Sequence, residues 1–494
     1  MLRRFCTALA STVCAALPVA VVGGAFTPAA AIDQVVLQLP LLETSFTVSL
    51  RELDNPAALW SGQSDLAELN RASGGAVGQR LLEVFDTPLP IQTRQVVGQI
   101  VGTPLLQQAL LAASALGRVD GLPADPSGAE LTVAVERASA TGELTLLTIL
   151  RALPGKSVSV DLPRAVSMLQ RMVSQRRQAT ALVEQGPAVT AAPAFVRAGS
   201  RTVVRSLISV PAAHRAQPLE VVVLEPQRDA NGRVVVISHG LWDSPENFEG
   251  WGRHLASHGY RVLLPRHPGS DSSQQQAMLS GRTAPPSPEE LRLRPLDVTV
   301  VIDAAAVRSV VVIGHSWGAT TALQLAGSQP SADRLRERCD DLNDPERNVS
   351  WVLQCSFLGS ADRAGLADRR VRAVVAVSPP VRLLFDYGAA SSMQARALLV
   401  SGSRDWVVSP DPEAVQPFRA AGAGGHELVL VEGGDHFNLR APADGDGGPL
   451  RGLVLAWTDA AFAAGPAAAP GPQARPLLPD AGWGNDQLPL VRVR

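Results

Sequence analysis

The hydrophobic pattern divides the 494-residue chain into two parts with different local order. Beyond about residue 200, short apolar runs rich in β-branched residues alternate with segments of helix length. Such runs are typical of strands buried on both faces of a parallel sheet. The alternation predicts an α/β fold with a mostly parallel eight-stranded sheet and flanking helices over residues 194–464. The expected strands are Val203–Val210, Leu219–Leu224, Val234–Ile237, Arg261–Leu264, Val310–Ile313, Val371–Val377, Ala397–Val400 and Leu428–Val431.

The first part of the chain, residues 32–187, follows a helical period after one stretch, Phe46–Leu50, that fits a strand. Thr103 fits a helix cap with Pro104 at the first helical position, and Asp161 fits a cap for the helix that follows it. This part contains no histidine, and nothing in it is typical of catalysis. We predict a small, mainly helical domain that packs on its neighbour or binds a partner protein of unknown identity.

Two segments rich in proline flank the second part. The stretch from Gly186-Pro187 to Pro193 predicts a linker between the two domains. Proline and glycine are frequent again from residue 465 onward, which predicts an irregular tail over residues 465–494.

The first 31 residues have the composition of an export signal. Arg3 and Arg4 precede an uncharged, mostly apolar stretch that ends at Phe26, and Ala29–Ala31 supplies a small-residue cleavage signature. We predict a cleaved signal peptide over residues 1–31 and a periplasmic or secreted protein. The alternative is an uncleaved membrane anchor, because the apolar run is nearly long enough to span a bilayer.

A polar insertion over residues 328–370 interrupts the strand pattern and carries Cys339 and Cys355. In an oxidising compartment these cysteines are expected to form a disulfide, the alternative being two free thiols. We expect the insertion to border the functional site; a solvated surface loop is the competing interpretation.

Composition narrows the class of protein. Hydrophobic residues make up 46% of the chain, charged residues 18%, and the mean hydropathy is +0.10. These values exclude a disordered, collagen-like or multi-span membrane protein. The formal net charge is −2, and the basic residues form no block or stripe, so no nucleic-acid partner is expected.

The strongest chemical motif follows the strand expected at Val310–Ile313. Residues Gly314–Gly318 read G-x-S-x-G, and the segment after them is helical in character. A sharp turn from strand to helix lifts the hydroxyl of the central residue, Ser316, above the sheet and points the amide end of the helix at it. Ser316 is therefore the predicted nucleophile; a structural serine in a glycine turn is the alternative.

A nucleophilic serine needs a base, and the base needs an orienting acid. His436 follows the strand at Leu428–Val431, and Asp405 follows the strand at Ala397–Val400. The carboxyl ends of parallel strands share one sheet edge, so these side chains are expected to converge on Ser316. The competing acids are Asp411 and Asp435. His426 precedes its strand and is expected at the opposite sheet edge.

Attack on a carbonyl also requires donors for the oxyanion. The first strand-to-loop turn of the sheet, after Ile237, predicts one such donor at the backbone amide of Leu241, with Trp242 as the alternative. The second predicted donor is the amide of Trp317, directly after the nucleophile. His239 and His315 are interpreted as residues that hold these turns through hydrogen bonds.

Several aromatic residues directly follow the predicted site residues, although aromatic residues are only 4% of the chain. Trp242, Trp406 and Phe437 are predicted to wall an apolar substrate pocket, and core packing is the alternative for each.

The chain resembles a known family through a set of separate motifs, namely Ile237–Leu241, His258–Tyr260, His267–Ser270, Arg294–Val298, Gly314–Gly318 and Glu432–Phe437. The family comprises exported bacterial α/β-hydrolases labelled predicted dienelactone hydrolases, which are related to platelet-activating-factor acetylhydrolases. The N-terminal part resembles the domain of unknown function that precedes the hydrolase in that family. The resemblance implies an α/β-hydrolase fold and a serine hydrolase with Ser316, Asp405 and His436 at the matching positions.

Two positions depart from the family pattern. Dienelactone hydrolases use a cysteine nucleophile where this chain has Ser316, so the family label does not define the substrate. Trp317, Gly318 and Ala319 stand where relatives commonly carry phenylalanine and two glycines, and a narrower pocket near the nucleophile is expected.

These observations predict an exported carboxylic ester hydrolase that forms an acyl-enzyme. Small-molecule or lipid esters are the expected substrates, acetyl and short-acyl lipid esters included. This chemistry needs neither a metal nor a cofactor. Two alternatives stay open: an acyltransferase with the same triad, and a non-catalytic binding protein with a hydrolase fold.

Overall fold

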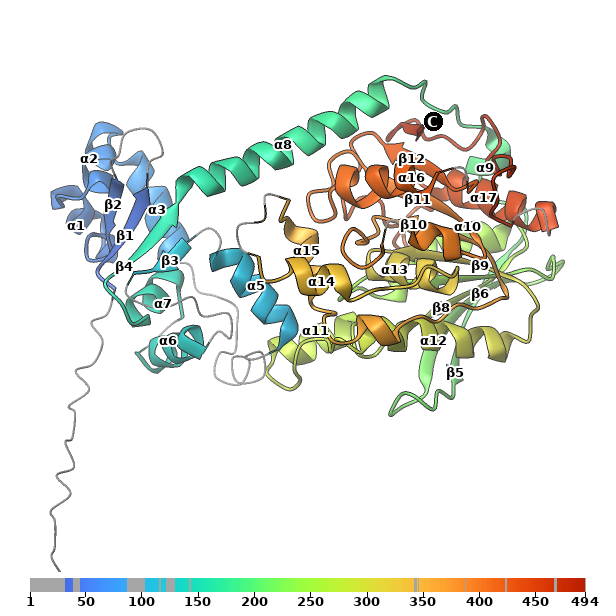
Figure 1. The fold of residues 1–494 in the computed structure, drawn as a ribbon, viewed down its shortest axis with the longest axis horizontal. Coiled ribbons are helices and arrows are strands. Elements are labelled where there is room, and N and C mark those ends of the chain that lie inside the picture. The colour runs from blue at the N-terminus through green and yellow to red at the C-terminus, as the bar shows by residue number, and fades with distance from the viewer. Residues whose placement is uncertain are drawn as a thin grey trace, which may run out of the picture.

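The computed structural model describes most of the chain beyond the first 31 residues (Figure 1). The predicted signal peptide lies outside the described residues. Within the described part, no helix combines the length and apolar character needed to cross a membrane. The described ranges are 32–38, 45–86, 103–114, 117–120, 129–141, 144–341, 344, 346–386, 388–422, 424–465 and 469–493.

A nine-stranded mixed sheet forms the centre of the C-terminal part, in the order β13-β12-β11-β10-β9-β7-β8-β6-β5. The neighbouring pairs from β8 through β7, β9, β10 and β11 to β12 are parallel, whereas β5–β6, β6–β8 and β12–β13 are antiparallel. The strands are β5 Val203–Val210, β6 Leu219–Pro226, β7 Val234–Ser238, β8 Arg261–Pro265, β9 Val310–His315, β10 Val371–Val377, β11 Arg396–Gly402, β12 Glu427–Val431 and β13 Leu490–Val493.

All eight expected strands are present, but the prediction of a mostly parallel eight-stranded sheet was wrong in strand number and direction. A parallel connection needs a crossover of a dozen or more residues, and the segment between β5 and β6, residues 211–218, is too short for one. The ninth strand, β13, lies inside the predicted irregular tail. It pairs antiparallel with β12 at the sheet edge, with Leu428 opposite Val493.

Helices cover both faces of this sheet. Along β9, Val310 and Val312 face one apolar core with α12 and α13, whereas Val311 and Ile313 face a second core with α10 and α17. Burial on both faces explains why these strands read as continuous apolar runs rather than alternating ones. The helices are α10 Glu249–Ser257, α11 Ser272–Leu279, α12 Glu290–Ala305, α13 Trp317–Leu325, α16 Gln416–Ala421 and α17 Arg451–Ala464.

The N-terminal part contains a four-stranded sheet in the order β2-β1-β4-β3 as well as helices. The strand expected at Phe46–Leu50 is β2, but the other three strands were not predicted, so the mainly helical description is incomplete. These strands are short, and β4 reads Ser-Val-Ser-Val-Asp, an alternation typical of a sheet with one polar face. The elements are β1 Gln34–Gln38, β2 Ser45–Ser49, β3 Gly117–Val119, β4 Ser157–Asp161, α1 Pro56–Ser61, α2 Asp65–Ala72, α3 Ala76–Asp86, α5 Pro104–Ser114, α6 Ala129–Thr141, α7 Leu146–Ala152, α8 Leu162–Glu184 and α9 Pro193–Val196.

Two helices of the N-terminal part contact the C-terminal part of the chain. The long helix α8 begins directly after β4 and extends to the large sheet, where it contacts β12 and β13 (Figure 1). Val183, near its C-terminal end, is part of the core beneath α12 and α13. Separately, α5 packs against α15, Val349–Cys355, which belongs to the insertion.

The insertion is folded around a disulfide. Cys339 follows α14, Asp333–Arg338, and is bonded to Cys355 at the end of α15, with 5.7 Å between their Cα atoms. The predicted disulfide is therefore present. The indole of Trp351 is buried beside it, and the guanidinium groups of Arg338 and Arg347 lie 4.7 Å and 5.4 Å from its centroid.

Removal of this disulfide is expected to destabilise the protein. The bond closes a loop between residues 16 apart in sequence, which corresponds to about 3 kcal/mol of unfolding free energy. Urea unfolding of Cys339→Ser/Cys355→Ser beside the wild type measures the lost unfolding free energy. The control is the same pair of measurements in the presence of a reductant. Reductant is expected to shift the wild type but not the double variant. Equal stability of the two proteins would show that the bond does not constrain the unfolded chain.

Candidate active site

The turn between β9 and α13 holds Ser316 in a strained conformation. Its φ of 54° and ψ of −122° are unusual for a residue with a side chain, and they match the sharp strand-to-helix turn predicted for G-x-S-x-G. The Ser316 N–H donates to the carbonyl of Val377 on β10, at 2.9 Å, which fixes the turn to the neighbouring strand. A side chain at Gly318 would collide with the Ser238 carbonyl at the end of β7. Glycine is therefore required there.

The structure brings His436 and Asp405 together. Asp405 follows β11 and His436 follows β12, and the His436 Nδ1 lies 3.0 Å from the Asp405 Oδ2. The other carboxylate oxygen, Oδ1, accepts the N–H groups of Val407 at 3.0 Å and Val408 at 2.8 Å. Both side chains are buried. Because a carboxylate can only accept, the neutral imidazole in this pair carries its proton on Nδ1, and its Nε2 is then available as an acceptor.

Ser316 lies at the same sheet edge, next to the histidine loop. The side chain of His315, its neighbour, is hydrogen-bonded through Nε2 to the backbone carbonyl of His436 at 2.9 Å, and the two imidazole rings are 4.8 Å apart. Among the described residues, no hydrogen bond joins Ser316 Oγ to His436. Hydrogen bonds in free enzymes are often looser than in substrate complexes, so this geometry is compatible with a nucleophile and base.

The competing acids make other contacts. Asp435 Oδ1 accepts the N–H groups of Phe437 and Asn438, each at 2.8 Å, and so holds the loop that carries His436. Asp411 accepts from the side chain of Gln416 at 2.8 Å. Neither carboxylate hydrogen-bonds to the His436 ring in the described part of the chain.

The two predicted oxyanion donors belong to the turn after β7 and to the residue directly after Ser316. Gly240 abuts the nucleophile turn, since a side-chain carbon built on it would lie 3.1 Å from the Ser316 Cβ. The next amide, that of Leu241, donates no hydrogen bond to any residue the structure describes. The Trp242 N–H donates to the carbonyl of Ser270 at 2.7 Å and is occupied. Trp317 is the first residue of α13, so its N–H has no partner within the helix.

The predicted pocket aromatics differ in environment. Trp406 and Phe437 are about half exposed, at 52% and 51%, on the loops that follow Asp405 and His436. Trp242 is partly buried, and its indole N–H donates to Gln274 at 2.9 Å. Trp317, in contrast, is buried against Phe357, with 4.5 Å between the ring centroids.

Trp406 lies where three parts of the chain meet. It lines a small cavity together with Met168 and Met172 of α8 and with Arg347 and Val349 of the insertion. The N-terminal part and the insertion therefore both reach the loop that follows Asp405.

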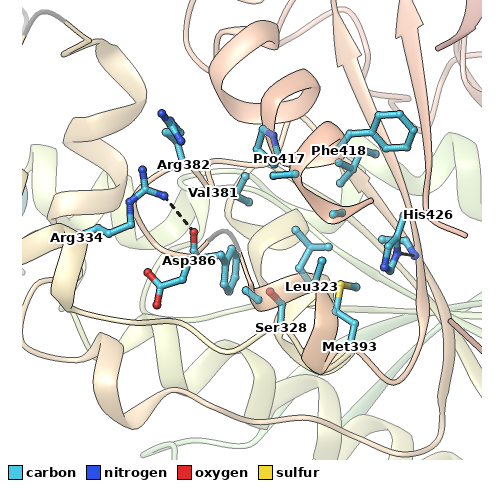
Figure 2. A pocket seen from close by; sticks show the side chains of 17 residues that line it. Leu323, Ser328, Arg334, Val381, Arg382, Asp386, Met393, Pro417, Phe418 and His426 are labelled. Atoms are coloured by element: carbon cyan, nitrogen blue, oxygen red, sulfur yellow. Dashed lines mark hydrogen bonds between the residues drawn. The ribbon is translucent and has the colours of Figure 1, made fainter. Parts of the chain in front are cut away.

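A larger apolar cavity lies between α13, α16 and the segment from Val381 to Met393 (Figure 2). Its volume is about 80 Å³, and none of the predicted site residues lines it. His426, the histidine expected at the other sheet edge, lines this cavity, and its Nδ1 accepts the Ala397 N–H at 3.1 Å.

The comparison with protein families agrees with this fold. Residues 233–335 match the family model described as alpha/beta hydrolase fold. The matched segment contains the turn after β7 and the nucleophile turn, but not Asp405 or His436. The match supports an α/β-hydrolase family and hydrolase activity. No curated protein matches the sequence.

A buried polar network lies behind the turn after β7; His239 was predicted to hold this turn, whereas Ser238, His267, Arg294 and Asp297 were not predicted as part of the site. Burial lowers the pKa of His239, in this network, and of His315, beside Ser316, well below the usual value. Burial and the nearby Arg294 cation lower the pKa of His267 to about 3, although Asp297 opposes this shift. Burial also lowers the pKa of His254, on α10, to about 4.

Stability is therefore expected to fall as the pH drops below about 6.5, the histidine pKa in an unfolded chain. Each buried imidazole takes up a proton on unfolding, so each removes about 1.4 kcal/mol of unfolding free energy per pH unit between its unfolded and folded pKa values. Urea unfolding between about pH 7 and pH 5 measures the slope.

His254→Gln is the matched variant for this prediction. It can still donate to the Phe195 carbonyl, which His254 Nε2 contacts at 2.8 Å, but it has no group that titrates. Its slope is expected to be smaller by about 1.4 kcal/mol per pH unit. A constant stability across this range would contradict the neutral, buried state of these histidines.

Proposed function

We propose that the chain is an exported ester hydrolase that acts through Ser316, His436 and Asp405. The observation that carries the proposal is the contact between His436 and Asp405, at 3.0 Å, on the sheet edge where the strained turn presents Ser316. An orienting acid, an imidazole and a serine held in this order constitute a nucleophilic site.

The proposed reaction has two halves. His436 Nε2 takes the proton of the Ser316 hydroxyl as Oγ attacks the carbonyl carbon of the ester, and the carbonyl oxygen becomes an oxyanion. The amides of Leu241 and Trp317 donate to that oxyanion. The C–O bond to the alcohol then breaks, and His436 returns the proton to the departing alkoxide.

Water completes the cycle in the second half. His436 takes a proton from water as the water oxygen attacks the acyl-enzyme, and Ser316 leaves with that proton when the acid is released. Asp405 stabilises the imidazolium in both halves.

The substrate side of the proposal is an ester with an apolar acyl or alcohol group. The half-exposed rings of Trp406 and Phe437 adjoin the site, and apolar walls of this kind are common in ligand pockets. Acetyl and short-acyl lipid esters are the proposed substrates. The disulfide of the insertion is typical of an oxidising compartment and supports a periplasmic or secreted location.

Hydrolysis of p-nitrophenyl esters, from acetate to palmitate, tests the nucleophile. Ser316→Ala is expected to lower kcat by several orders of magnitude. Ser378→Ala is the matched control, because Ser378 also has a positive φ, 49°, at the end of a neighbouring strand, and it is expected to stay active. Asp405→Asn is expected to lose roughly 10⁴-fold in kcat, whereas Asp411→Asn is expected to retain activity.

The outcomes separate the alternatives. A fluorophosphonate probe that labels the wild type and Ser378→Ala but not Ser316→Ala supports a reactive serine. Transfer of the acyl group to an added alcohol in preference to water indicates an acyltransferase. No hydrolysis and no labelling in the wild type would overturn the proposal in favour of a binding protein.

The role of the exposed aromatic residues has its own test. Trp406→Ala is expected to raise KM for the preferred ester roughly tenfold, about 1.4 kcal/mol of lost apolar contact. Trp242→Ala is also expected to raise KM for this ester. Trp60→Ala is the control, because Trp60 is equally exposed, at 51%, on α1 of the N-terminal part. An unchanged KM for every ester in both site variants would remove these rings from the pocket.

A further inference from the structure

The backbone turn after β7 is held by an unusual set of buried polar groups. Ser238, His239, His267, Arg294 and Asp297 are at most 1% exposed, and they come from three separate segments of the chain. Burial of charged and polar groups is unfavourable unless each is hydrogen-bonded, so their arrangement calls for a physical explanation.

The tautomer of His239 follows from its partners. Its Nε2 lies 3.1 Å from the backbone nitrogen of His267, and that N–H can only donate, so Nε2 carries no proton. The proton of the neutral ring is therefore on Nδ1, which donates to the Gly240 carbonyl at 2.8 Å. Burial and the nearby Arg294 cation keep the pKa of His239 well below its usual value, so the ring stays in this neutral form.

The carbonyl that accepts the His239 hydrogen bond belongs to the peptide that also carries the Leu241 N–H. Gly240 C=O and Leu241 N–H share one planar trans peptide, so fixing the oxygen also fixes the direction of the N–H on the other side. Gly240 abuts Ser316. The His239 ring thus sets the orientation of the amide that is proposed to donate to the oxyanion.

Arg294 anchors the turn on both sides of this peptide. One guanidinium nitrogen donates to the His239 carbonyl, and another donates to the Ser270 hydroxyl at 2.6 Å. The Ser270 carbonyl in turn accepts the Trp242 N–H at 2.7 Å. The peptides on the two sides of the Gly240–Leu241 unit are therefore both tied to the Arg294 guanidinium on α12, the first directly and the second through Ser270.

The charge of Arg294 is buried without a direct counter-ion. Within the described residues it forms no ion pair, and its Nε has no hydrogen-bond partner. Burial lowers the pKa of Arg294 to about 10, with Glu290 and Asp297 opposing the shift. A buried cation of this kind is unfavourable for folding.

A second line of contacts supports the same turn. Asp297 accepts from His267 Nδ1 at 2.8 Å, and His267 Nε2 accepts the hydroxyl proton of Ser238, at 2.9 Å. His214 and Arg215 bind the same carboxylate at 2.8 Å and 2.7 Å. Burial would raise the pKa of Asp297, but these hydrogen bonds outweigh it and hold the carboxyl well below its usual range.

We infer that His239, protonated on Nδ1, and Arg294 are positioning residues that lock the Gly240–Leu241 peptide with its N–H directed at the oxyanion. The inference rests on the proposed function and specifies how its oxyanion site is held. Neither residue touches substrate; each acts through the backbone.

Two substitutions of His239 separate this role from a general structural one. Asn places an amide nitrogen near the Nδ1 position and retains the donor to the Gly240 carbonyl. Gln places its amide near the Nε2 position and retains only the partner of the His267 N–H. His239→Gln is expected to lower kcat on the order of 10²-fold with KM little changed, the effect of one lost oxyanion donor. His239→Asn is expected to recover most of that loss.

Arg294→Lys extends the test, because a lysine reaches one of the two acceptors at most. Its affinity for an alkyl trifluoromethyl ketone, which mimics the oxyanion when bound to serine, is expected to fall in step with kcat/KM. Urea unfolding identifies variants that lose activity through unfolding. Equal kcat values in His239→Gln and His239→Asn, with both proteins folded, would overturn the inference that His239 positions the Gly240–Leu241 peptide.

A measurement on the wild type needs neither a variant nor catalysis. Nitrogen-15 NMR of labelled histidine is expected to show the His239 ring as the neutral Nδ1–H tautomer at neutral pH. The Nε2–H tautomer or a charged ring would overturn the inference. If esters are not hydrolysed and Ser316 is not labelled while this tautomer is found, the proposed function fails and the geometry of the turn stands.

Discussion

The site depends on the close approach of two backbone turns at one end of the large sheet. The turn after β9 carries Ser316 at a positive φ, and the turn after β7 brings Gly240 against it. Any side chain at Gly318 would separate the two turns by colliding with Ser238. Strain at Ser316 persists because the flanking strands are buried on both faces and paired on both sides, so the turn cannot relax.

The buried polar groups behind this contact explain how a turn without regular secondary structure stays rigid. Backbone groups in a loop have no ladder partners, and here side chains supply them: His239 for the Gly240 carbonyl and Arg294 for the His239 carbonyl. The same groups are expected to make the domain sensitive to acid, because burial lowers the pKa of His239 and His267. Stability and the geometry of the site therefore share one set of residues.

Sequence patterns predicted the strands well because all of the eight except Val203–Val210 are nearly unbroken apolar runs. They predicted that His436 and Asp405 would converge because parallel strands end at one edge. Strand direction was not encoded in those runs. The strand β13 escaped prediction because it is four residues long within a segment rich in proline and glycine. The pairing of Arg294 with the turn after β7 had no signature, since residues 55 apart in sequence meet only in the folded chain.

The contact between α5 and α15 is favoured because α8 already tethers the N-terminal part to the large sheet. The helix α8 spans 23 residues, about 35 Å at 1.5 Å per residue, and it already fixes the N-terminal part to β12 and β13 at its far end. The docking of α5 on the insertion is thus an association between tethered partners, governed by an effective concentration rather than by the concentration of the protein. A contact too weak to hold two separate molecules together persists under these conditions, and its occupancy does not change on dilution.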